Sequence, residues 1–296
     1  MLVSRLLLPL LHGCAGGDAC EGAAEGACDT SEATPRVDTG VPIFAQEDPT
    51  PEWTAIDVGD TLREVLAHGF PNAQALKETY LGMMANGDAS CPGSDTILSE
   101  AYILGCVAPS GYFYSGVCVY EGNVLENEAG TTTSWGLGGD FLLEYPDGDV
   151  FEAGGGATWS GQQTPDGDET YESALRGTWI DASSETWLGQ GFSGLFEARG
   201  GVRAGEPWVA IDGGVAIGDA DLYFDDLRWD WGGPCRGTPA GSVRLRDTRG
   251  YWYVWSLEGD CDICGDVVFH GDTNLGPLCL DLQPLGADVW HSLAMP

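Results

Sequence analysis

The chain has 296 residues and a formal net charge of −34, from 46 acidic and 12 basic residues. A surface this acidic repels phosphate backbones and tends to keep a protein soluble and monomeric, so we expect a monomer that binds no nucleic acid. Hydrophobic residues nevertheless make up 43% of the chain and eleven residues are tryptophan. That composition excludes a wholly disordered chain.

Residues 1–13 are typical of an export leader. Arg5 supplies a positive charge, Leu6 to Leu11 form an apolar stretch, and the run from Leu11 to Cys14 resembles a bacterial lipobox. We predict cleavage before Cys14 and lipid attachment at that residue, which would anchor the protein to a membrane surface. Plain secretion is the first alternative, and an uncleaved terminal segment is the second.

The next two segments differ sharply in composition. Residues 14–50 are rich in small and acidic residues with almost no large apolar ones, which predicts a disordered acidic tether. Residues 51–90 carry the only helical pattern and are expected to form a short N-terminal helical appendage. We expect Asp60 to cap a first helix that ends at Gly69 and Pro71, and a second helix to start near Asn72.

Residues 91–290 have the pattern of an antiparallel β domain. Aromatic and β-branched runs recur about every 10 to 16 residues between Gly, Pro and Asp, and Pro146–Asp149 and Pro165–Asp168 are hairpin signals. We therefore predict a mainly β fold built as a large antiparallel sheet assembly, which could be a sandwich, a meander or a barrel. The expected strands cover residues 112–120, 140–145, 150–158, 171–180, 186–197, 208–217, 221–230, 242–247, 251–257, 266–270 and 278–282.

Ten cysteines in an exported chain indicate disulfide bonds. Sequence order suggests a pair in the tether, a pair before the first strands and a C-terminal group of four, namely Cys20 with Cys28, Cys91 with Cys106, and Cys235, Cys261, Cys264 and Cys279. Cys118 would be left over. The C-terminal group could instead bind zinc or form a redox pair, but an exported chain favours disulfides.

Several of these segments resemble a known family. Three segments are similar to the end of predicted cell-envelope lipoproteins from myxobacteria-like Gram-negative bacteria, namely Gly241–Trp252, Cys261–Gly265 and Leu275–Leu282. Four shorter ones are similar to their earlier cysteine segment, namely Cys91-Pro92, Gly105-Cys106, Ser110–Tyr112 and Ser115-Gly116. The resemblance covers much of residues 91–283. It implies a location in the cell envelope and paired cysteines, and it implies no known activity.

No catalytic motif stands out in the sequence. Ser193 lacks the second spacer of a nucleophile elbow, and His270 near Asp272 is explained by a strand end next to a turn. We expect no cofactor, although calcium is possible because it prefers carboxylate oxygens. The weak calcium candidates, which ordinary turns and a wet strand face would also explain, are Asp219, Asp221, Asp225 and Asp226.

Clustered aromatic residues are the remaining signal. Trp229 with Trp231, and Tyr251 with Tyr253 and Trp255, would each share one strand face. Such rows stack on sugars when exposed and form the core when buried, and we expect the core.

The functional prediction is a non-catalytic cell-envelope or surface lipoprotein with a structural or adhesive role. It would be lipid-anchored, in the outer membrane, or else secreted. Its expected partners are the membrane, through the anchor, and a glycan or an envelope protein. The alternatives are a calcium- or glycan-binding β module and an unrecognised hydrolase.

Overall fold

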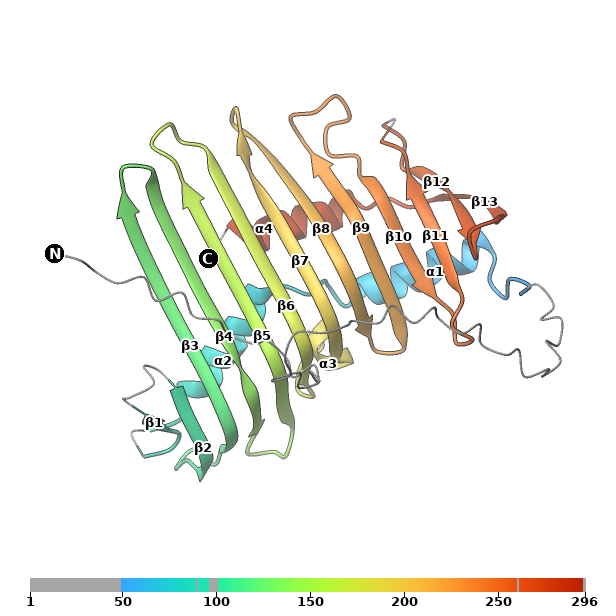
Figure 1. Cartoon of the computed structure of the whole chain (residues 1–296). Coiled ribbons are helices and arrows are strands. Elements are labelled where there is room, and N and C mark those ends of the chain that lie inside the picture. The colour runs from blue at the N-terminus through green and yellow to red at the C-terminus, as the bar shows by residue number, and fades with distance from the viewer. Residues whose placement is uncertain (1–48, 89, 96–100, 260, 295–296) are drawn as a thin grey trace, which may run out of the picture. The chain divides into compact units, whose positions relative to one another are not determined.

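The structure is a computed structural model that describes residues 49–88, 90–95, 101–259 and 261–294 (Figure 1). Side chains of residues 93–95 and 101–104 are not described. The predicted leader, nearly all of the predicted tether, and the candidate residues Cys14, Cys20 and Cys28 lie outside the described residues.

The described strands form one antiparallel sheet in which each strand pairs with the next along the chain (Figure 1). The fold is therefore mainly β, as predicted, and of the three expected arrangements it is the meander, because the sheet is not closed into a barrel. The strands are β1 (Gly93–Asp95), β2 (Ala101–Val107), β3 (Phe113–Asn127), β4 (Gly130–Glu144), β5 (Val150–Gln163), β6 (Glu169–Asp181), β7 (Phe192–Arg203), β8 (Glu206–Ile217), β9 (Ala220–Asp230), β10 (Ala240–Arg246), β11 (Trp252–Leu257), β12 (Cys264–Phe269) and β13 (Thr273–Cys279).

Tight turns join the long central strands. The Pro146–Asp149 and Pro165–Asp168 segments connect β4 to β5 and β5 to β6, which confirms both hairpin predictions. In each turn the third residue, Gly148 or Gly167, has a positive φ that glycine adopts without strain. Strand pairing then continues without a break along β4, β5 and β6.

A row of glycines crosses the sheet on four neighbouring strands. Gly139, Gly155, Gly177 and Gly194 are register partners on β4 to β7. A Cβ atom on any of them would lie 2.1–2.2 Å from a carbonyl oxygen of the adjacent strand. Only glycine fits this row, because any side chain would push neighbouring strands apart. Part of the high glycine content is therefore required by the backbone.

Three helices cover one face of the sheet, α1 (Ala55–Ala67), α2 (Ala73–Met84) and α4 (Gln283–Ala294) (Figure 1). Side chains on alternate positions of the strands point to this covered face and form the core. Buried polar groups fix the helices there: Tyr114 donates to the carbonyl of Met83, and the Trp159 indole to that of Leu293. The N-terminal helices pack on the sheet and belong to the same compact unit.

The helix boundaries differ from the prediction in three places. Helix α1 begins earlier because Thr54, not Asp60, caps it, through a reciprocal capping box with Asp57. A short helix, α3 (Trp187–Gln190), replaces the start of the strand predicted at residue 186. Helix α4 occupies a C-terminal region where no helix was expected. Asn72 caps α2 as predicted.

The aromatic rows are core, as expected. Trp229, Tyr253 and Trp255 are completely buried on the covered face, while Trp231 and Tyr251 pack at its margin. Sugar stacking by the buried rings is therefore ruled out. An aromatic side chain that binds a sugar must come from another part of the sheet.

Candidate functional site: the uncovered sheet face

The face of the sheet opposite the helices, which we call the outer face, carries a group of arginines on β7, β9 and β10. On β9, Arg228 lies between the buried residues Leu227 and Trp229, so its side chain points to the outer face. The same alternation places further arginines of β7 and β10 there, namely Arg199, Arg203, Arg244 and Arg246. These five belong to only 12 basic residues in the whole chain.

Each of these arginines is paired with a carboxylate or an aromatic ring. Arg199 and Arg228 both contact Asp226, at 2.9 and 3.6 Å. Arg203 lies over the ring of Trp208, with 4.6 Å between the guanidinium carbon and the ring centroid. Pairs this exposed contribute little to folding stability. Such cross-strand pairs are ordinary on the solvent-facing side of an antiparallel sheet.

Two further pairs extend the series along β10. Arg244 pairs with Asp225 and lies over the ring of Tyr223. Arg246 contacts Asp221 at 3.6 Å and lies over the ring of Trp252. The outer face therefore presents planar, hydrogen-bonding side chains beside aromatic rings.

A hollow of about 620 Å³ opens on this face between β7 and β10. Strand register explains it, because Arg199, Ala210, Arg228 and Ala240 are cross-strand neighbours. Ala210 is too small to fill the space between the two arginines, and Ala240 leaves space on the other side of Arg228. The rim includes Cys235, whose disulfide with Cys261 joins the two neighbouring loops.

The charges around the hollow are balanced. Three arginines line it, and so do three acids, Asp226, Asp230 and Glu258. Asp230 accepts hydrogen bonds from the N–H groups of Gly232 and Gly233 at 3.0 and 2.9 Å. Trp208 lies at one side, and its buried indole N–H has no hydrogen-bond partner among the described residues. The arrangement suits a neutral ligand with many hydroxyl groups better than a strongly charged one.

The four calcium candidates do not form a cluster. Asp221, Asp225 and Asp226 are each paired with arginine on the outer face, and Asp219 lies in the exposed turn between β8 and β9. In the described part of the chain, no group of three or more His, Cys, Asp or Glu side chains is arranged to hold a metal. The calcium hypothesis therefore receives no geometric support.

Three disulfides are present in the described residues. Cys91 is bonded to Cys106, the pair that sequence order suggested. The C-terminal group forms two bonds, Cys235–Cys261 and Cys264–Cys279, and so is not a zinc site. Disulfides indicate an extracytoplasmic protein. Cys118 is the free cysteine among the described residues, and burial raises the pKa of its thiol to about 12.

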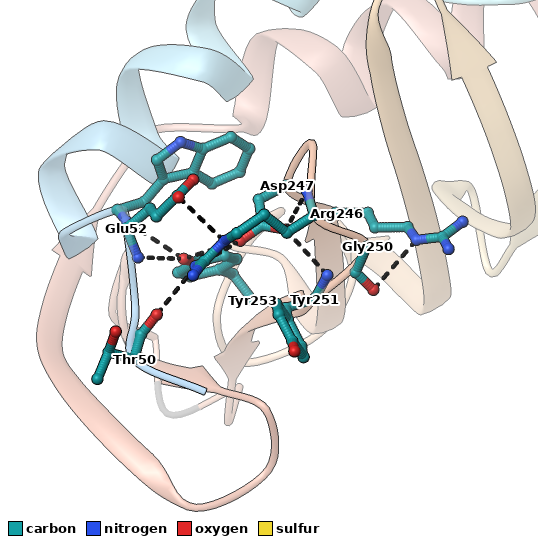
Figure 2. Close-up of polar contacts among 9 residues, drawn as sticks. Thr50, Glu52, Arg246, Asp247, Gly250, Tyr251 and Tyr253 are labelled. Carbon is teal, nitrogen blue, oxygen red and sulfur yellow. Dashed lines mark hydrogen bonds and ion pairs between the residues drawn. The ribbon is translucent and has the colours of Figure 1, made fainter. Parts of the chain in front are cut away.

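A buried carboxylate, which sequence analysis did not single out, organises the turn between β10 and β11 (Figure 2). Asp247 accepts hydrogen bonds from the backbone N–H groups of Arg249 and Tyr251 and from the Arg249 guanidinium. Burial acts to raise the pKa of Asp247, but the Tyr251 N–H and the Arg249 guanidinium outweigh it, so the pKa is lowered. The sequence pattern that could have indicated this turn is an aspartate followed two and four residues later by the two backbone donors, with Gly250 between them.

The same turn holds the start of the described chain (Figure 2). Arg249 donates to the carbonyl of Thr50 at 2.9 Å and contacts the Glu52 carboxylate at 3.1 Å. The hydroxyl of Tyr253 accepts from the N–H groups of Glu52 and Trp53. These contacts join two segments that are about 200 residues apart in sequence. They hold the segment that precedes α1 against the turn between β10 and β11.

The nucleophile candidates are not brought together. Ser193 is exposed on β7, and His270 is exposed in the β12–β13 turn, where its ring lies edge-on to Tyr251. Comparisons of the chain with protein-family models, curated proteins and solved structures gave no match. Within the described residues, every helix is too short or too polar to cross a lipid bilayer.

Proposed function

We propose that this chain is a non-catalytic surface protein of the cell envelope that binds carbohydrate through its outer face, in an adhesive role. In this proposal Cys14 carries the lipid anchor, in the outer membrane, and the acidic tether holds the sheet domain away from the bilayer. The observation that carries the proposal is the hollow beside Trp208. The extracytoplasmic setting indicated by the disulfides agrees with it.

Carbohydrate is the ligand class that this hollow fits best. Sugar hydroxyls act as donors and acceptors at once, which matches arginine donors set beside carboxylate acceptors. The Trp208 ring lies in the lining of the hollow, and the Arg203 guanidinium that lies over it would have to move aside for a sugar ring to stack there.

Binding can be tested with the purified chain and an array of neutral oligosaccharides. We expect tryptophan fluorescence to change with the sugar that binds, and Trp208→Ala to weaken binding at least tenfold. The matched control is Trp252→Ala, which changes another outer-face tryptophan stacked with an arginine but not in the hollow. Equal binding by the wild-type chain and the Trp208→Ala variant would refute the proposal.

The anchor can be tested separately. Wild-type chain should sediment with membranes, and intact mass should show cleavage before Cys14 with added acyl mass. A Cys14→Ala variant should appear in the soluble fraction instead. Wild-type protein that is soluble and retains Met1 would refute the anchor while leaving carbohydrate binding open.

A further inference from the structure

Among the described residues, strand β3 has no partner on its β2 side along about half of its length. β2 pairs with β3 only as far as Ala101 opposite Val119, whereas β3 continues to Asn127. On its other side, β3 remains paired with β4 to the end of the hairpin. Among the described residues, no strand pairs with β3 beyond Val119 on the β2 side, and residues 121–127 are all exposed. Figure 1 shows this strand reaching well past β2.

The hairpin geometry identifies which backbone groups face outward. Asn127 and Gly130 flank a two-residue turn and so form the hydrogen-bonded pair that closes the hairpin. Backbone groups of an antiparallel strand alternate between its two edges. The N–H and C=O groups of Gly122, Val124 and Glu126 therefore point away from β4, and no strand among the described residues pairs with these three donors and three acceptors.

This edge lacks the protection that the opposite edge of the sheet has. Sheet edges are normally blocked by proline, bulges, positive charge or a covering segment, because an open edge pairs with other chains. β13 contains Pro277, pairs with β12 through a bulge and is crosslinked at Cys279. On β3, Val124 and Leu125 are instead 67% and 60% exposed, one on each face of the strand.

Charge selects the kind of strand that can be added. The exposed segment and its turn carry Glu121, Glu126 and Glu128 and no basic residue. A second copy of a chain with a net charge of −34 would be repelled. A strand with lysine or arginine between apolar residues would meet opposite charge and would cover Val124 or Leu125.

We propose that the free edge of β3, residues 121–127, binds an extended basic segment of another protein by β-strand addition. Main-chain hydrogen bonds to Gly122, Val124 and Glu126 supply the affinity in this mode, and the glutamates supply the selectivity. The site is separate from the hollow on β7 to β10. It gives an adhesive protein a second contact, directed at protein rather than carbohydrate.

The test uses the full chain and a synthetic seven-residue peptide that alternates lysine with valine. We expect it to bind at least tenfold more tightly than a peptide with glutamate in place of lysine, and its binding to weaken as salt is added. Val124→Pro removes one outward N–H without touching the bonds to β4, and should weaken binding at least tenfold. Val124→Thr, which keeps the N–H, is the matched control and should bind like wild type.

If Val124→Pro does not fold, the proposal can still be tested by measuring hydrogen exchange of the wild-type chain with and without the peptide. The peptide should slow exchange in residues 121–127 and leave the β13 edge unchanged. Absence of protection there, or equal binding of the two peptides, would overturn the proposal. Trp208→Ala should leave peptide binding intact, so the outcome is independent of the carbohydrate proposal.

Discussion

The two faces of the sheet are built from alternate residues of the same strands, yet they differ in almost every property. On the covered face, large aromatic side chains are completely buried, and the indoles of Trp159, Trp229 and Trp255 each donate to a backbone carbonyl. On the outer face, arginines pair with carboxylates and remain about half exposed. The burial that stabilises the fold is therefore concentrated on the covered face, and the outer face contributes little to folding stability.

The comparison predicts its largest effect at Trp229. Its side chain is completely buried, and its indole donates to the Leu282 carbonyl at 3.0 Å. Trp229→Ala should lower the free energy of unfolding by about 3–5 kcal/mol, because it leaves a cavity and an unpaired carbonyl. Trp208→Ala on the outer face should cost only about 1 kcal/mol. Urea denaturation of the two variants measures the difference, and equal losses would break the comparison.

A smaller effect is expected where the sheet ends in short strands. β12 and β13 are crosslinked by Cys264–Cys279, which closes a loop with a sequence separation of 15 residues. A loop of that size predicts a loss of about 3 kcal/mol when both cysteines are changed to alanine. Thermal unfolding should show a lower Tm for the double variant. If reduction lowers the Tm of the wild-type and variant chains equally, this bond does not stabilise the fold.

The sequence predicted the sheet better than it predicted what lies on it. Val243 and Leu245 alternate with Arg244 and Arg246, and that period of two correctly separates the covered face from the outer face. Local composition was enough for such strands and their turns. The short α3 was missed because Trp187 and Leu188 lie next to the aromatic run that forms β7, so that one continuous strand was predicted over both segments.

Helix α4 and the hollow depend on contacts that local patterns do not contain. A Cβ atom on Gly286 would lie 2.6 Å from the Trp229 ring, so the helix needs glycine at the point where it crosses β9. That glycine weakens the helical signal in the sequence. The hollow requires Arg199, Ala210, Arg228 and Ala240 to be aligned, which follows from strand register rather than from any one segment.

Asp247 tests the comparison between the two faces in another way, because it is a buried charged residue. Asp247→Asn removes a carboxylate that accepts several hydrogen bonds, and should cost about 1–3 kcal/mol. Its pKa is lowered in the folded chain, so the stabilisation is present above the ordinary aspartate value of about 3.9. It is lost as the pH falls through the lower, folded value.

The free energy of unfolding, measured as a function of pH, should therefore differ between the wild-type chain and Asp247→Asn. The wild-type chain should lose more stability than Asp247→Asn between about pH 5 and pH 2. The control is Asp60→Asn, which changes an exposed aspartate paired with Arg63. Parallel pH profiles for wild type and Asp247→Asn would mean that this carboxylate does not anchor the turn.

The smallest effect belongs to the outer face. Arg244 and Asp225 form an ion pair in which the side chains are 41% and 48% exposed. Water screens such a pair and holding it costs side-chain entropy, so Arg244→Gln should change the free energy of unfolding by less than about 1 kcal/mol. Urea denaturation at low and high salt measures this, and the difference from wild type should shrink as salt is added. A loss as large as that of Trp229→Ala would show that the outer face holds the fold together, and the assignment of recognition to this face would then lose its physical basis.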